Sequence, residues 1–150
     1  MTTISLAFVL QTALVATTAN SNTYTEAREK TAQTGKPLVV LVGADWCPAC
    51  QTMKNSAMPQ VARRGALSKV AYAVVNTDHD SGLAQQLMRG GSIPQLVMYR
   101  ETPTGWKRES LVGAQDPAAI ESFINRGLEG LKAPDTSLGE ASRPTAEERE

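Results

Sequence analysis

The chain has 150 residues, of which 41% are hydrophobic and 20% are charged. This length allows one domain of ordinary size, and the apolar content is sufficient for a buried core that needs no disulfide staples. Fifteen basic residues balance fifteen acidic ones, and no cluster of Lys and Arg is interleaved with aromatic residues, so the sequence does not predict a nucleic-acid-binding surface.

Residues 1–19 have the pattern of an export signal. Apolar residues dominate this segment, no charged side chain precedes Glu26, and the small residues Thr17 and Ala19 suit the positions before a cleavage site. A run of about 15 apolar residues is short for a membrane span, and the segment has no cysteine for lipid attachment. We therefore expect a periplasmic or secreted protein. The alternatives are a chain tethered to a membrane by residues 4–18 and a cytoplasmic chain with an apolar N-terminal helix.

Helical and strand patterns alternate along the middle of the chain. Apolar and small residues at helical spacing predict a first helix over 23–34, which Gly35 ends. The unbroken apolar run 38–43 predicts a central strand that is covered on both faces. Pro59 is expected to break the helix that starts at Pro48 and to start a second short helix through Val61, Ala62 and Arg64. Further strands are expected at 70–75, 96–99 and 106–112, and further helices at 81–88 and from Pro117 onward.

The C-terminal segment differs in composition from the rest of the chain. Residues 131–150 are rich in Pro, Ser, Thr and Glu and have too few apolar side chains to offset the entropy lost on ordering. The sequence therefore predicts three parts: a signal peptide or apolar anchor at 1–19, one folded domain at 22–130, and a disordered tail at 131–150.

Both cysteines lie in one motif, Asp45-Trp46-Cys47-Pro48-Ala49-Cys50, directly after the apolar strand. Two thiols at C-x-x-C spacing in the first turn of a helix can reach each other. The unpaired amides and the positive dipole end of that helix would stabilise a thiolate at Cys47, which is the form that attacks a disulfide. Cys50, one turn deeper, would then resolve the mixed disulfide. Pro48 suits the first helical position, and Trp46 can cover the sulfurs.

Two other interpretations of the motif are weaker. Zinc needs about four ligands, whereas this chain offers the two cysteines and the distant His79. A purely structural bridge would close so small a loop that it would constrain the unfolded chain little. Asp78 and Asp80, which flank the histidine, are expected to be turn and N-cap residues. No metal site is therefore predicted.

The motif resembles the active site of the thioredoxin superfamily, and D-W-C-x-A-C resembles in particular the periplasmic reductase domain of DsbD-type proteins. The resemblance covers roughly 22–130. It implies a thioredoxin-like α/β fold with a central mixed β-sheet of four to five strands flanked by helices. It also implies that Ile93-Pro94 is the cis-proline segment, in which Ile93 pairs with the substrate backbone and Pro94 flanks the sulfurs. Gly113 corresponds to a glycine that allows close approach near the active site.

The sequence departs from that family at two positions. Thioredoxins carry a buried Asp where this chain has Leu41, so proton transfer must use water, the thiols or a carboxylate outside this strand, and Asp45 is the nearest candidate. Ala49 stands where the family has Pro or His before the second cysteine. A neighbouring positive charge would stabilise the thiolate and make the disulfide more oxidising, so the absence of His favours a reductant or an isomerase-side partner.

These features predict a thiol-disulfide oxidoreductase that reduces or exchanges disulfides in extracytoplasmic proteins. It would need no cofactor beyond the redox-active pair Cys47 and Cys50. Its expected partners are protein disulfide substrates and an electron-donor thiol protein, for which a membrane-bound protein is a candidate. No nucleic-acid partner is expected, and the chain is expected to be monomeric. The alternative is a non-catalytic thioredoxin-fold module that binds a client polypeptide, or copper on the two thiolates.

Overall fold

The computed structural model describes residues 23–132, so the expected signal segment and most of the expected tail lie outside the described residues. Helices and strands alternate along the described chain, as predicted. They are α1 (Tyr24–Thr34), β1 (Leu38–Gly43), α2 (Pro48–Thr52), the π-helix η1 (Met53–Ala57), α3 (Met58–Arg63), the 3-10 helix η2 (Ala66–Lys69), β2 (Ala71–Asn76), α4 (Ser81–Leu87), β3 (Gln95–Thr102), β4 (Gly105–Val112) and α5 (Pro117–Lys132).

The strands of the described residues form one four-stranded sheet in the order β2-β1-β3-β4. β1 and β2 are parallel, whereas β3 is antiparallel to both of its neighbours, β1 and β4. The sheet is therefore mixed, and its number of strands falls within the predicted range. β4 is an antiparallel edge strand.

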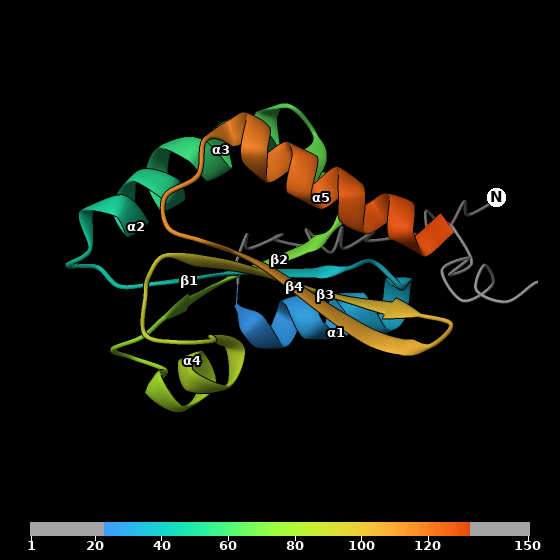
Figure 1. Cartoon of the computed structure of the whole chain (residues 1–150), viewed down its shortest axis with the longest axis horizontal. Coiled ribbons are helices and arrows are strands. Elements are labelled where there is room, and N and C mark those ends of the chain that lie inside the picture. Colours follow the sequence, from blue (N-terminus) through green and yellow to red (C-terminus); the bar gives the residue numbers. More distant parts are fainter. Residues whose placement is uncertain (1–22, 133–150) are drawn as a thin grey trace, which may run out of the picture.

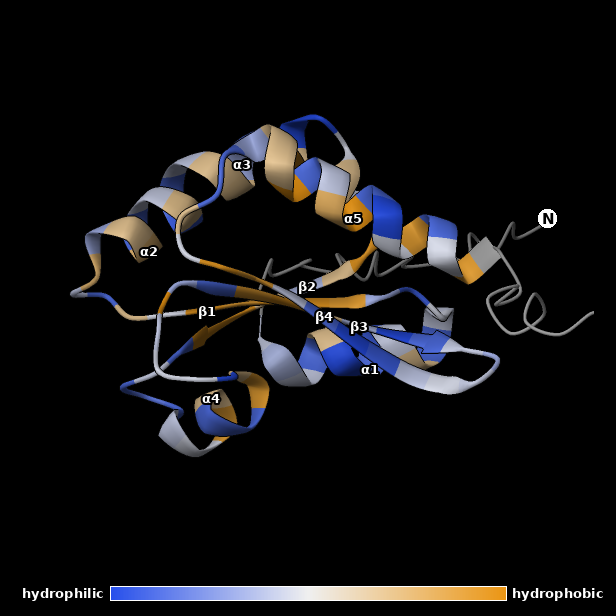
Figure 2. Ribbon diagram, in the orientation of Figure 1, coloured by the Kyte–Doolittle hydropathy of each residue, from blue (hydrophilic) through white to orange (hydrophobic). Residues whose placement is uncertain are grey.

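Helices cover both faces of this sheet. Figure 1 shows α2, α3 and α5 on one side of the strands, and α1 and α4 on the other. Because alternate residues of a strand point to opposite faces, Val39 and Leu41 of β1 join the core under α3 and α5, while Val40 joins the core against α1 and α4. Every residue of β1 is buried, and this strand is largely orange, and so hydrophobic, in Figure 2. This confirms the prediction of a central strand covered on both faces.

Pro59 does not interrupt the helical path that begins at Pro48. A proline lacks the N–H for a bond to the fourth residue before it, and its ring collides with that carbonyl. The chain widens into the π-helix η1 directly before α3, with Met58 N–H bonded to Met53 O, and Pro59 lies in the first turn of α3. The proline therefore marks the start of a new α-helical segment, as expected. The expected break in the helical path does not occur.

The last helix lies close against β3. Asp116 begins α5 by accepting a hydrogen bond from Ala119 N–H at 2.8 Å, as an N-cap residue does. A side chain at Gly127 would collide with Met98, and one at Gly130 would collide with the Arg100 guanidinium. The helix continues to Lys132, two residues past the predicted domain boundary.

Arg100 and Glu109 form an ion pair between β3 and β4, with Nη2 and Oε1 2.6 Å apart. The Arg100 side chain is largely buried, while that of Glu109 is 39% exposed. In the part of the chain from residue 23 to 132, none of the helices combines the length and the apolar character that crossing a membrane requires.

Candidate redox site

Cys47 and Cys50 form a disulfide where β1 ends and α2 begins. Cys47 is the N-cap residue of α2, and its Sγ accepts a hydrogen bond from Cys50 N–H at 3.2 Å. Pro48 occupies the first turn of the helix, where a missing N–H costs nothing. The sulfur of Cys47 thus lies at the positive end of the helix, against an otherwise unpaired amide. Helix N-termini and unpaired amides in general favour a thiolate over a thiol.

The side chains around the disulfide differ from the expectation for Trp46. Cys47 is 6% exposed and Cys50 is 4% exposed, and the apolar residues packed against them are Ala44, Ala49 and Ile93. Trp46 is 68% exposed. Its ring therefore extends into solvent beside the site, and the small Ala44 and Ala49 with Ile93 provide the apolar cover of the sulfurs.

The cis-proline segment reaches the disulfide from β3. The Ile93-Pro94 peptide bond is cis, as predicted, and Ile93 packs against the cysteines. Gly113, just after β4, donates its backbone N–H to Pro94 O at 2.8 Å and has a positive φ of 86°. The structure therefore joins Ile93, Pro94 and Gly113 at one side of the redox pair.

Gln95 is a residue of this site that the sequence interpretation missed. Its side chain is fully buried, and its Nε2 donates to Ser92 O at 2.8 Å and to Arg89 O at 3.1 Å. Its Oε1 accepts from Arg89 N–H at 3.3 Å. A buried amide with three backbone partners holds the segment that leads to Pro94. The available indication was a polar residue at the start of an otherwise apolar strand.

Gly43 is a second residue that was missed. A Cβ at this position would lie 2.9 Å from Cys50 Cβ and 3.0 Å from Cys50 Sγ. Such distances are shorter than packed carbon and sulfur atoms accept. The last residue of β1 therefore has to be small for Cys50 to sit where it does, and only the spatial contact reveals this.

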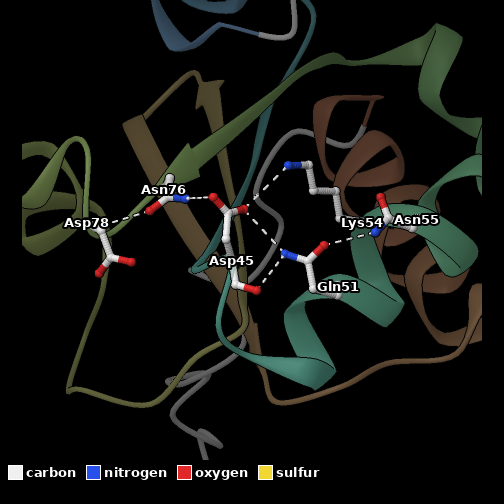
Figure 3. A network of polar contacts seen from close by, with 6 residues as sticks. All are labelled: Asp45, Gln51, Lys54, Asn55, Asn76 and Asp78. Carbon is white, nitrogen blue, oxygen red and sulfur yellow. Dashed lines mark hydrogen bonds and ion pairs between the residues drawn. The ribbon is translucent and has the colours of Figure 1, made fainter.

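Asp45 is the centre of a polar network beside the disulfide, shown in Figure 3. Its Oδ2 accepts from Asn76 Nδ2 at 2.9 Å, and its Oδ1 accepts from Gln51 Nε2 at 3.3 Å. Lys54 Nζ lies 3.9 Å from Oδ1. Asn76 also accepts from Asp78 N–H at 2.8 Å through its Oδ1. The carboxylate is thus fixed between the end of β2 and the first turns of the helix.

Leu41 and His79 have no polar role in this geometry. Leu41 is 1% exposed and belongs to the apolar core, so the strand position at which thioredoxins have Asp offers no proton acceptor. His79 is exposed after β2. Asp80 takes the N-cap position of α4 without a side-chain capping bond. Within residues 23–132, no three His, Cys, Asp or Glu side chains converge as a metal site would require.

Comparison with known proteins defines the class to which this fold and site belong. The model of a thioredoxin-like family matches residues 19–101, more than half of the chain. No curated protein matches the chain in sequence. The chain belongs to the thioredoxin-like family.

Solved thioredoxin structures share the fold at low sequence identity. A thioredoxin from Thermus thermophilus is 23% identical with a TM-score of 0.59, over 71% of this chain and 84% of that one. Chloroplastic thioredoxin z is 19% identical with a TM-score of 0.59, over 72% and 92%. Mitochondrial thioredoxin 3 from Saccharomyces cerevisiae, in its oxidised form, is 21% identical with a TM-score of 0.53, over 70% and 91%. These likenesses confirm the predicted fold.

A thioredoxin-like fold that carries a C-x-x-C disulfide indicates a thiol oxidoreductase in general. The closer resemblance to DsbD-type domains stays a prediction, because the structures compared above are thioredoxins.

Proposed function

We propose that this protein reduces or exchanges disulfide bonds in extracytoplasmic proteins, with Cys47 as the attacking thiolate and Cys50 as the resolving thiol. The observation that carries the proposal is the hydrogen bond from Cys50 N–H to Cys47 Sγ at 3.2 Å, at the start of the helix. A donor and a helix dipole at the same sulfur favour its thiolate over its thiol. The partner sulfur is already within bonding reach, since the two form a disulfide.

The reaction begins with the pair reduced. The Cys47 thiolate attacks one sulfur of the substrate disulfide, the substrate S–S bond breaks, and the released substrate thiolate takes up a proton. A mixed disulfide then joins the substrate to Cys47. Cys50 loses its proton and attacks Cys47 Sγ, which expels the second substrate sulfur as a thiol and forms the Cys47–Cys50 disulfide. Two electrons have passed to the substrate, and an external dithiol must restore the pair.

The substrate would bind beside Ile93 and Pro94. Ile93 packs against the cysteines, and the neighbouring Val112 is 51% exposed. Trp46, directly before Cys47 in the chain, is also exposed. These side chains offer an apolar surface around a reactive sulfur, which suits an unfolded or extended polypeptide. The backbone of Ile93 would then pair with the substrate, as the family resemblance implies.

Three further parts of the proposal concern direction, donor and location. Ala49 puts no positive charge beside Cys50, which favours a reductant over a strong oxidant. A reductant needs a donor, for which we propose a membrane-bound thiol protein. The pattern of residues 1–19 supports export. The pair itself carries the electrons, so the reaction requires no bound cofactor.

An insulin-reduction assay tests this function. Wild-type protein with dithiothreitol should precipitate insulin chains faster than dithiothreitol alone, and Cys47→Ser should remove the acceleration because no nucleophile remains. Cys50→Ser should also lose turnover, since the mixed disulfide is not resolved. A wild-type rate equal to that of dithiothreitol alone would overturn the proposal and favour a module that binds a client polypeptide without turnover.

A further inference from the structure

Cys50 and Asp45 both line one small cavity. It offers about 20 Å³ to the centre of a water molecule, and one water needs roughly 10–15 Å³ on this measure. Its walls come from β1, the loop that follows it, the first helical turns and β2. The lining residues are Leu41, Gly43, Ala44, Asp45, Cys50, Gln51, Lys54, Val74 and Asn76.

Three polar side chains that could hold a water line this cavity and are joined to one another by hydrogen bonds. The Asp45 carboxylate is held by Asn76 and Gln51 at 2.9 and 3.3 Å, and Gln51 Nε2 also donates to Asp45 O at 3.2 Å. A buried water typically makes about three hydrogen bonds, and the donors and acceptors of these three side chains supply that number. The apolar lining residues include Leu41 and Val74.

The resolving step creates a need for a proton acceptor at this place. Cys50 is 4% exposed, so its proton has little direct access to bulk solvent. Leu41, on the strand below, cannot accept it. The Asp45 side chain is 61% exposed, so a proton that reaches it can leave to solvent. Besides Cys50, the titratable groups that line the cavity are Asp45 and Lys54, and the ammonium of Lys54 favours negative charge there.

We propose that Asp45, acting through one water in this cavity, accepts the proton that Cys50 loses when it attacks the mixed disulfide. The inference rests on the proposed function and assigns the proton path of its second step. The Cys50 S–H bond breaks as the proton passes to the water, the water gives a proton to the Asp45 carboxylate, and the sulfur electron pair forms the bond to Cys47 Sγ. The expelled substrate sulfur takes a proton from solvent, to which Asp45 returns the one it accepted.

The test separates the two chemical steps in one trace. Reduced protein is mixed with an excess of the aromatic disulfide 5,5′-dithiobis(2-nitrobenzoate) in a stopped-flow instrument. A first coloured thiolate is released when Cys47 attacks, and a second when Cys50 resolves the adduct. Asp45→Asn should leave the rate of the first phase within about twofold of wild type. It should slow the second phase by about 10- to 100-fold at neutral pH, which is at or below the smallest rate effects typical of general acid-base catalysis. Asp78→Asn removes a nearby carboxylate outside the cavity and should leave both phases unchanged.

The pH dependence distinguishes a proton acceptor from a structural support. Without Asp45 the proton must leave to hydroxide, so the second phase of Asp45→Asn should rise steeply with pH, by about tenfold per unit, and approach the wild-type rate in alkali. Asp45→Glu should restore part of the neutral rate. A second phase equal to wild type at every pH would overturn the inference, as would a slowing of both phases by the same factor at every pH. Failure of the proposed function would be seen separately in the insulin assay, because that assay measures turnover by the wild-type protein.

Discussion

Gly43 lies so close to Cys50 that residue 43 has no room for a side chain. Because a Cβ on Gly43 would approach Cys50 Cβ to 2.9 Å, Gly43→Ala should force the redox helix away from β1 and lower the free energy of unfolding of the oxidised protein by about 1–3 kcal/mol. Urea unfolding measures this change. Gly82→Ala is the matched control, because Gly82 lies in α4 and a Cβ added there would meet no other atom within 4 Å. This substitution should leave the stability unchanged or raise it by up to about 1 kcal/mol. Equal stability of Gly43→Ala and wild type would refute the contact.

Gln95 should support the cis-proline segment through its buried amide. Gln95→Leu keeps the volume but removes the hydrogen bonds to Arg89 and Ser92, which should cost about 1–3 kcal/mol. Amide hydrogen exchange should accelerate in residues 88–93, and insulin reduction should slow. Gln86→Leu, at an exposed position of α4, should change neither measurement. Unaltered exchange in Gln95→Leu would show that the amide does not hold this segment.

The ion pair between Arg100 and Glu109 should respond unequally to loss of its two members. Glu109→Ala leaves a largely buried guanidinium without its carboxylate and should cost about 1–3 kcal/mol in urea unfolding. Arg100→Met should cost less, because Glu109 is partly exposed and water can solvate it. The more exposed pair of Arg64 and Glu121 provides a control, and Glu121→Ala should cost at most about 1 kcal/mol. Similar losses for Glu109→Ala and Glu121→Ala would contradict this explanation.

Tyr72 should make the protein sensitive to alkali. Burial raises the pKa of the Tyr72 phenol, because an ionised phenolate would lose its hydration. The folded chain therefore holds this proton where the unfolded chain releases it, and stability should fall as pH rises above about 10. Urea unfolding across this range should show a smaller alkaline loss in Tyr72→Phe. Tyr24→Phe should retain the wild-type loss, and a wild-type slope in Tyr72→Phe would refute the assignment.

Local patterns predicted the main elements of this fold and the centre of its site. The apolar run of β1, the C-x-x-C pair after it and the Ile93-Pro94 segment can each be recognised within a few consecutive residues. Their geometry depends mostly on backbone rules that act over one turn or one strand. The cis peptide bond was expected from the family resemblance.

Other features depend on contacts between distant segments and could not be predicted in this way. Asn76 reaches Asp45 across 31 positions of the chain, and the need for glycine at residue 43 exists only because Cys50 packs above it. The exposure of Trp46 likewise depends on which residues pack beside it, because the same sequence is compatible with a ring packed over the sulfurs and with a ring exposed to solvent. The helical path continues through a π-helix before Pro59, because packing of the helix outweighs the local tendency of proline to end a helix.

Trapping of a mixed disulfide tests the central claim most directly, namely that Cys47 attacks and Cys50 resolves. Reduced Cys50→Ser and Cys47→Ser proteins are each incubated with a peptide disulfide at neutral pH and analysed by mass spectrometry. Cys50→Ser should accumulate a stable adduct on Cys47, whose sulfur lies at the helix start, whereas Cys47→Ser should form little or none. Equal adducts in the two variants, or an adduct predominantly on Cys50, would contradict these assignments.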